Sequence, residues 1–366
     1  MVRRLWDQFG LGERIDARSA GVAGLFRPSL MVELWVTLLL YGGTVMDDLA
    51  WFRGRGIRRL FGWMRVSDPT TFGRWLRRAA AQLVPVVDEL VWHLVRVRWH
   101  PQGAPERVML VLDSTVEVRY GKKRAGAEKG YNPKKPGRTS HHPLVVTIAE
   151  TGDLVGVQWR PGSAASATGA TEWLQLLVAR LREAGVNEIT KDPATSILSN
   201  SGTLYGARLL SLEWRKKEAG EEVLVQSDRI VQRAHVLTNI PGFHAPTAWR
   251  AYNDGAAVEQ RIEELGQLGA GRTAVDDLDG NALLWQMAAL AYQLLHVLRT
   301  TTLQGSWRRA QPHRLRAWLF RVPAKLTRHA RKQYVQLRRN EPVRLLLLRS
   351  LRRIAQLRAP PDFASP

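Results

Sequence analysis

Apolar and polar positions follow three different patterns along the chain, and each pattern predicts a different region. Residues 1–100 carry apolar residues at helical spacing, which predicts a helical N-terminal region. Short apolar runs between turn residues occupy residues 106–300 and predict strands alternating with helices. In residues 301–358, arginines are interleaved with apolar and aromatic residues, which predicts amphipathic helices with a basic face. The whole pattern predicts an α/β core with helical regions at both ends.

The clearest strand signal lies in residues 107–160. An apolar, β-branched run from Val108 to Leu112 ends at Asp113, and two further runs flank the turn residues Gly152 and Asp153. Buried strands are short and rich in β-branched residues, so we predict a strand, a basic loop and a hairpin. A carboxylate at the end of such a strand either caps a turn or holds a metal ion, and the cations of the loop favour the metal ion.

Later elements are predicted from the same two periodicities, since apolar residues recur at helical or strand spacing between turn residues. A strand is short and a helix is longer, which assigns most of the segments. The predicted order is a helix over Ala170–Glu183, a strand over Ala194–Leu198, a helix holding Tyr205, Leu209, Leu210 and Leu212, a strand over Ala234–Ile240, a helix from about Thr247 to Leu268, and a core helix over Asn281–Leu298.

The N-terminal region contains a second basic feature. A helix is predicted to begin near Asp68, where a capping residue precedes Pro69. It carries Arg74 and Arg77 beside apolar residues, and a short turn separates it from the preceding helical segment. This order favours a helix-turn-helix-like DNA-binding region in residues 1–100. The alternative is an amphipathic helix whose basic face is solvated.

Charge is the dominant feature of the composition. Lys and Arg number 54 against 33 Asp and Glu, a net charge of +21, which is typical of proteins that bind nucleic acid or another polyanion. Residues 307–353 hold 15 Lys or Arg and one acid, so phosphate binding is the favoured function of this tail and a solvated basic face is the alternative. The absence of cysteine excludes disulfides and thiolate metal sites.

The sequence also bears on localisation. No secretory signal is visible, and the apolar run Leu34–Val45 is too short to span a bilayer. We therefore expect a cytoplasmic protein associated with the nucleoid and not with a membrane. A basic protein of the membrane surface is a weaker alternative, because no cationic stretch stands apart from aromatic-rich, folded sequence.

An ordered set of motifs begins at Asp113-Ser114-Thr115. It continues with Tyr120-Gly121, with GYNPKKPGR over residues 130–138, and with His142-Pro143-Leu144. This order resembles bacterial insertion-sequence transposases of the DDE class, in the branch that carries a YG…GYNPKKPGR..HPL segment after the first catalytic Asp. The resemblance extends over roughly residues 20–355. It implies an RNase H-like mixed sheet with flanking helices, in which two Asp and one Glu bind divalent metal for DNA cleavage and strand transfer.

The resemblance also implies the roles of single residues. Asp113 and Glu259 match the first and last catalytic acids and would be metal ligands, and Asn200 stands where the second Asp belongs. Asp192 lies in a loop before the predicted strand and is a poor substitute by register. Tyr252 fits the spacing of the family signature that leads to Glu259. Mg²⁺ or Mn²⁺ is the expected cofactor, because hard cations prefer carboxylate oxygens, and no organic cofactor is expected.

The chain departs from the family pattern at three places. Asn200 brings no negative charge, a β-rich insertion is shortened to about residues 214–233, and Gly255 and Gly266 replace an Arg and a Lys of the signature. The resemblance implies an insertion-sequence transposase that cleaves DNA and transfers strands at terminal inverted repeats. The departures favour the alternative of a catalytically inactive DNA-binding relic.

The expected partner is double-stranded DNA, both the terminal repeats of the element and the target, and a homodimer on DNA is one open arrangement. Cations near the first acid, on the N-terminal helix and in the tail are the expected contacts, because phosphates attract Lys and Arg. The residues expected to contact DNA are Lys122, Lys123, Arg124, Lys134, Lys135, Arg138, Tyr252, Arg74, Arg77, Arg328, Arg331 and Lys332.

Overall fold

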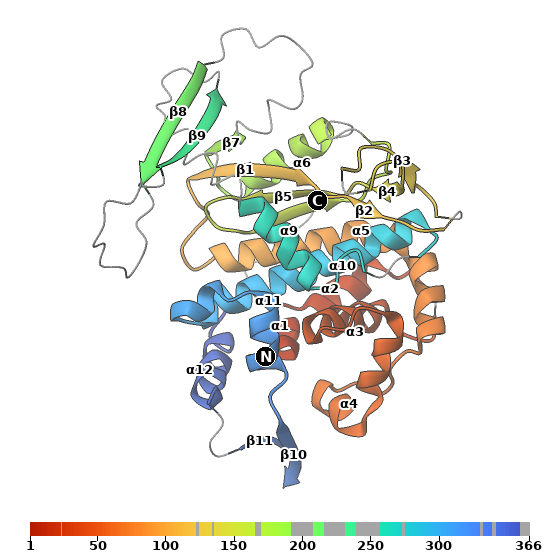
Figure 1. The fold of residues 1–366 in the computed structure, drawn as a ribbon. Coiled ribbons are helices and arrows are strands. Elements are labelled where there is room, and N and C mark those ends of the chain that lie inside the picture. The colour runs from red at the N-terminus through yellow and green to blue at the C-terminus, as the bar shows by residue number, and fades with distance from the viewer. Residues whose placement is uncertain are drawn as a thin grey trace, which may run out of the picture.

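A four-stranded sheet lies between one helix and a larger body of helices (Figure 1). The computed structural model describes residues 1–22, 24–121, 124–133, 135–164, 170–191, 208–215, 231–238, 257–272, 275–329, 332–338 and 342–358. The described part is a mixed α/β structure, as the sequence predicts.

The sheet has the strand order β6-β5-β1-β7. β5 is antiparallel to both β1 and β6, whereas β7 is parallel to β1. The four strands are β1 (Arg107–Ser114), β5 (Leu144–Ile148), β6 (Leu154–Gln158) and β7 (Glu188–Lys191). α6 (Ala170–Glu183) connects β6 to β7. The predictions of a first strand ending near Asp113, of a hairpin turning at Gly152, and of a helix over Ala170–Glu183 are confirmed.

Two apolar clusters hold the sheet, one on each face. Alternate residues of a strand point to opposite faces, so each strand contributes to both clusters. Val108 and Leu110 of β1 join leucines of α6 and the end of α5 (Pro69–Trp99) on one side. Val145, Leu154 and Val157 face the helical body on the other side. The sheet is therefore covered on both faces.

The helical body is built on α10 (Leu278–Val297). This helix is apolar almost all round and buried along most of its length, and such helices belong in a core. Asp277 caps its first turn by accepting a hydrogen bond from the Gly280 amide at 2.6 Å. Both α5 and α3 (Pro28–Tyr41) pack against α10, so the N-terminal helices share one core with it. The predicted core helix is confirmed.

The basic helix of the N-terminal region is α5. Asp68 caps it as predicted, because its carboxylate accepts a 2.8 Å hydrogen bond from the Thr71 amide. Arg74 and Arg77 are exposed while the apolar face is buried in the core. α5 is 31 residues long and packs along α10. It is therefore an amphipathic helix with an exposed basic face, which is the alternative that the sequence leaves open. The helix-turn-helix-like function of this region stays a prediction.

Shorter elements complete the body and the loop that follows β1. The N-terminal ones are α1 (Val2–Gln8), α2 (Leu11–Arg18), the 3₁₀ helix η1 (Met46–Arg53) and α4 (Arg55–Phe61). A small sheet of order β2-β4-β3 follows β1 and consists of β2 (Glu117–Val118), β4 (Thr139–His141) and β3 (Glu128–Lys129). The later ones are α9 (Ala257–Gln267), η2 (Leu298–Thr302), η3 (Gly305–Arg309), α11 (Pro312–Leu315), η4 (Arg316–Phe320) and α12 (Arg344–Ile354).

The prediction of an entirely helical basic tail is wrong. β10 (Ala324–His329) and β11 (Lys332–Leu337) form an antiparallel hairpin, and only α12 is a long helix there. Leu326 and Tyr334 lie eight residues apart, a spacing that also fits a helix. In the structure the residues after Pro323 are extended, so successive side chains alternate between the two faces of a strand. Short apolar runs do not distinguish helix from strand by periodicity, and here the cross-strand pairing decides.

A second correction concerns residues 208–215, for which the sequence predicts a helix holding Leu209, Leu210 and Leu212. They form β8 (Arg208–Arg215), which pairs with β9 (Val231–Thr238) over eight positions. The pairing partner is distant in sequence, so local spacing could not show it. β9 confirms a strand close to the predicted Ala234–Ile240. The predicted strand Ala194–Leu198 lies outside the described residues.

The test for membrane-spanning helices gives one broken candidate. No single helix in the described ranges is long and apolar enough to cross a bilayer. α3 and η1 meet the length and composition criteria only when taken together, and they are bent by 93° relative to each other.

Candidate active site

Asp113 lies near the end of β1, opposite Val145 of β5. Its side chain is half-buried, and its Oδ1 accepts a hydrogen bond of 2.7 Å from the Ser114 amide. In the described ranges no Lys or Arg forms an ion pair with it. The sheet therefore holds a carboxylate at a fixed position and leaves its charge uncompensated.

Glu259 lies in the first turn of α9, on its exposed side. α9 packs across β1 and β5. Burial raises the pKa of Asp113, and the negative charge of Glu259 raises it further, while the Ser114 amide opposes both. The charge of Glu259 therefore acts on Asp113, with burial as the larger cause of the raised pKa.

A third acid is not seen beside this pair. Asn200 and Tyr252 lie outside the described residues, as does Gly255, and the described residues contain no cluster of three metal-binding side chains. The parallel pairing of β7 nonetheless gives a register, because Lys191 at its end lies opposite Leu110. The next residue in the sequence is Asp192. The sequence predicts no strand at β7, and places only a loop there before the predicted strand Ala194–Leu198.

The basic loop after β1 is described in part. Lys122, Lys123 and Lys134 lie outside the described residues. Lys135 and Arg138 both lie over the ring of Tyr120, with the cations 5.2 and 5.8 Å from its centre. The hydrogen bond from Lys135 lowers the pKa of the Tyr120 hydroxyl. Tyr120 is exposed, so the structure brings an aromatic ring and two cations together on the surface.

Arg124 belongs to the same loop but has partners within the protein. Its guanidinium lies 3.5 Å from Asp276 and donates to the Tyr120 carbonyl at 3.2 Å. Arg119 precedes the loop and is buried, and its guanidinium donates a hydrogen bond to the Gly271 carbonyl at 3.1 Å. The loop is therefore anchored to the segment that joins α9 to α10.

The remaining predicted DNA contacts belong to different elements of the fold. Arg74 and Arg77 lie on α5, well apart in sequence from the others. Arg328 and Lys332 lie on β10 and β11, for which the backbone is described at these two positions, and Arg331 lies outside the described residues. Their contact with DNA stays a prediction.

Sequence reasoning missed a buried polar network at the other end of the hairpin. Asp153 is fully buried and accepts hydrogen bonds from Arg98 at 2.6 Å, from the Trp99 indole at 2.9 Å and from Gln293 at 2.8 Å. Burial acts to raise the pKa of Asp153, but the hydrogen bonds and charges of its partners, with Arg98 foremost, together outweigh burial and lower the pKa. The signal in the sequence was only a Gly-Asp turn, because the partners lie far away along the chain.

His296 completes this network from α10. It contacts the Thr151 carbonyl through Nε2 at 3.0 Å, and Arg299 donates to its Nδ1. Burial lowers the pKa of His296 to about 3, although Asp153 opposes the shift. The ring is therefore neutral near pH 7, and its 3.6 Å contact with Asp153 is not an ion pair there.

A further node of the network lies beneath α9. Glu264 is buried and pairs with Arg299 at 2.8 Å and with Arg261 at 2.9 Å. A cavity of about 840 Å³ opens beside them and is also lined by Arg308 and Arg309. Glu264 faces this cavity from the side of α9 that is turned away from Glu259. The two acids of one helix thus lie in different surroundings, with Glu264 in a buried salt-bridge network and Glu259 exposed in the first turn.

A comparison with protein families assigns this architecture to a class. A family model described as transposase DDE domain group 1 matches residues 58–190 and 216–359, which together exceed half of the chain. The chain belongs to this family of transposase DDE domains. No curated protein matches it in sequence.

Proposed function

We propose that this protein is an insertion-sequence transposase that cleaves DNA phosphodiesters and transfers strands at terminal inverted repeats. The observation that carries the proposal is the Asp113 carboxylate, held at the end of β1 without an ion-pair partner in the described ranges, in a chain of the DDE family whose α9 packs on β1 and carries Glu259 in its first turn. Carboxylates whose negative charge the protein leaves unpaired form a site that a cation would stabilise.

The strand order supports an RNase H-like core. Three antiparallel strands followed by a helix and a fourth strand parallel to the first match that arrangement. β7 runs parallel to β1, and its described part ends at Lys191, opposite Leu110 and three residues before Asp113.

The residues fit a divalent metal in the chemistry of their donors. Asp113 and Glu259 offer carboxylate oxygens, the ligands that Mg²⁺ and Mn²⁺ prefer, and they lack a competing cation in the described part of the chain. Bound divalent metal supplies activation of the attacking oxygen and stabilisation of the leaving oxygen. The role of Asp113 is to hold its carboxylate rigidly on β1, and that of Glu259 is to complete the site from α9.

The third ligand has two candidates that rest on different arguments. The order of motifs assigns Asn200, whereas the end of β7 leads directly into Asp192. Asn200→Asp should raise Mg²⁺-dependent nicking if the motif argument holds. Asp192→Ala should abolish nicking if the strand argument holds, and Asp279→Ala, at an acid of α10, serves as its control.

The site is tested by nicking of supercoiled plasmid in Mn²⁺. The wild type should nick the plasmid, and both Asp113→Ala and Glu259→Gln should reduce the rate by at least a hundredfold. Glu263→Gln is the matched control, because Glu263 is an exposed acid on the same helix. Equal rates in wild type, Asp113→Ala and Glu259→Gln would overturn the assignment of the site.

The second candidate function is a catalytically inactive DNA-binding protein. Asn200 and the two glycines of the signature favour it, because they remove one negative and two positive charges from the family pattern. It is distinguished by an absence of nicking together with DNA binding that weakens steeply as salt rises. Nicking that depends on Asp113 would exclude it.

A further inference from the structure

The hairpin of β10 and β11 is a two-stranded ribbon that projects from the helical body (Figure 1). Its strands pair over six positions, from Ala324 and Leu337 at the base to His329 and Lys332 near the tip. In the described structure neither strand pairs with a third one. Isolated two-stranded ribbons are marginally stable in water, and open strand edges invite a partner. The ribbon therefore presents unpaired strand edges to which a partner can bind.

Cross-strand partners share a face of the ribbon, so the register sorts its residues into two sets. One set is polar and basic, with Lys325, Thr327 and His329 paired with Gln336, Tyr334 and Lys332. Tyr334 is 45% exposed in the middle of this face. The other set contains the pairs Ala324–Leu337, Leu326–Val335 and Arg328–Gln333, and Val335 is 52% exposed. Leu337 at the base packs against the helical core, whereas Tyr334 and Val335 show that both faces leave side chains exposed in the described part of the ribbon.

The charge around the ribbon has one sign. No acidic residue occurs between Asp279 and Glu341, a stretch that includes the whole ribbon and the helices that lead to it. Arg321 precedes β10 and the exposed Arg338 follows β11. A partner complementary to this element is therefore a polyanion, because an acidic or phosphate-rich surface supplies the counter-charges that the protein does not.

The dimensions of the ribbon match a groove of DNA. Two strands are separated by about 4.8 Å and six residues extend about 20 Å. The major groove of B-form DNA is about 12 Å wide and admits a two-stranded β-ribbon. We propose that the β10–β11 ribbon enters the major groove of DNA, with Thr327 and Tyr334 toward the base edges and the flanking cations toward the phosphates. This inference rests on DNA being the partner, as the proposed function requires.

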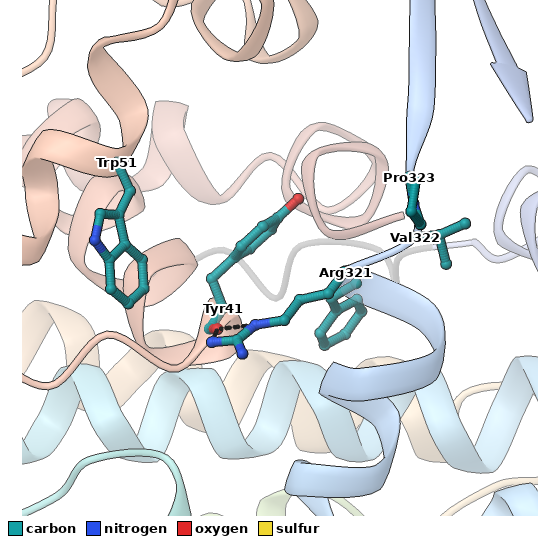
Figure 2. A pocket seen from close by; sticks show the side chains of 6 residues that line it. Tyr41, Trp51, Arg321, Val322 and Pro323 are labelled. Carbon is teal, nitrogen blue, oxygen red and sulfur yellow. Dashed lines mark hydrogen bonds between the residues drawn. The ribbon is translucent and has the colours of Figure 1, made fainter.

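The root of the ribbon is fixed to the body, as Figure 2 shows. Arg321 donates two hydrogen bonds to the Tyr41 carbonyl at the end of α3, at 3.0 and 2.7 Å. Tyr41, Trp51 and Arg321 line a cavity of about 450 Å³ next to Pro323, which restricts the backbone just before β10. Arg321 therefore ties the root of the ribbon to the end of α3.

The test is DNA binding measured without divalent metal, so that catalysis plays no part. Binding of a 30-base-pair duplex would be followed by fluorescence anisotropy in EDTA over a range of salt concentrations. Each phosphate contact contributes about 0.9 to the slope of log affinity against log salt. The Lys325→Ala/Lys332→Ala double variant should lower the slope by about 2, so between 50 and 200 mM salt the wild type loses roughly twelvefold more affinity than the variant.

The control removes two positive charges elsewhere. Arg4→Ala/Arg182→Ala takes exposed arginines from α1 and α6 and should leave the slope unchanged. Circular dichroism and thermal unfolding of each variant establish that the body stays folded. Equal losses of slope in the two double variants would overturn the proposal, because the ribbon would then act only through net charge.

The groove is tested by protection of guanine N7 from methylation, since this atom lies in the major groove. The wild type should protect guanines at its site, and Tyr334→Ala should lose that protection while Val335→Thr, on the opposite face, retains it. Unchanged protection in Tyr334→Ala, with DNA affinity intact, would overturn the ribbon but leave the proposed function standing. No DNA binding by the wild type would overturn both. A ribbon variant that changes only the oligomeric state, measured by light scattering, would assign the ribbon to a second copy of the chain.

Discussion

Two aspartates near opposite ends of β5 differ in how far the protein compensates their negative charge. Asp153 lies beyond one end, fully buried, where it is satisfied by Arg98, Trp99 and Gln293, and its pKa is lowered. Asp113 lies beside the other end, half-buried, with one amide donor, and its pKa is raised. Burial acts in the same direction on both. The neighbours decide, and the Asp113 end is left with negative charge that the protein itself does not compensate.

The contrast explains how a stable fold can carry an unfavourable site. The Asp153 network ties β5 and β6 to α5 and α10 through hydrogen bonds whose partners are far apart in sequence. α9 spans both ends, because Glu264 joins the network and Glu259 reaches the site. The network therefore fixes the helix that completes the site. One sheet thus carries a compensated acid at one end and, at the other, an acid without an ion-pair partner in the described residues.

The largest effect is expected from Asp153→Asn. This change leaves the Arg98 guanidinium buried without its counter-charge, and breaking a buried pair costs about 3–5 kcal/mol. Urea unfolding at pH 7 measures the loss in the free energy of unfolding. The matched variant is Asp113→Asn, the same substitution at the other end of β5. A smaller cost for Asp153→Asn than for Asp113→Asn would break the comparison.

The next effect is a pH dependence from His296. Its folded pKa of about 3 is below the unfolded value near 6.5, so the unfolded chain binds the extra proton between these limits. Stability should therefore fall as pH drops below about 6.5, by up to about 1.4 kcal/mol per pH unit from this residue. Urea unfolding at pH 7.0 and 5.5 should show this slope in wild type and a shallower one in His296→Gln. His100→Gln, at an exposed histidine, should keep the slope.

The pH dependence of stability that arises from Asp113 should have the opposite sign to the one from His296. The folded pKa of Asp113 is raised above its unfolded value, so ionisation of this group opposes folding, and stability is lost as pH rises through that pKa. Without divalent metal, the Asp113→Asn variant should be more stable than wild type at pH 7 and indistinguishable from it below the ordinary pKa of an aspartate. Thermal unfolding in EDTA measures the difference, with the exposed Asp47→Asn as the control. A destabilised variant at pH 7 would mean that Asp113 is a structural acid like Asp153.

The smallest effect sharpens the role of α9. Gly266 lies inside this helix, and a Cβ at its position would meet no atom within 4 Å. Gly266→Ala should therefore stabilise the protein by about 0.5–1 kcal/mol, through the lower backbone entropy of alanine in the unfolded chain. Gly269→Ala is the contrasting variant. Gly269 has a φ of 84°, which alanine adopts only with strain, so this change should destabilise the protein. Equal effects at the two glycines would contradict the helical assignment of Gly266.

Local patterns predicted the parts of the fold that are held by local sequence. β1, the β5–β6 hairpin, α6 and α10 have apolar periodicities that match their final environment, and Asp68 provides a cap. The tail and residues 208–215 were assigned to helices because short apolar runs fit both periods. Their strands are determined by pairing with β11 and β9, which no local window contains.

The site could be predicted only as far as its motifs reach. Asp113 and Glu259 are 146 positions apart, and the family resemblance, rather than spacing, connected them before the packing of α9 on β1 placed them together. The partners of Asp153 lie on α5 and α10, so the sequence showed only a turn. Tertiary contacts, and not local sequence, therefore determine that Asp153 is compensated by charged and polar partners.

The central claim is that Asp113 and Glu259 form a cation site, and Mn²⁺-dependent thermal stability tests it most directly. Mn²⁺ at about 100 times its dissociation constant should stabilise the wild type by about 2.7 kcal/mol, seen as a rise in Tm. Asp113→Ala and Glu259→Gln should lose this rise, while Glu263→Gln should keep it. Equal rises in wild type, Asp113→Ala and Glu259→Gln would contradict the account.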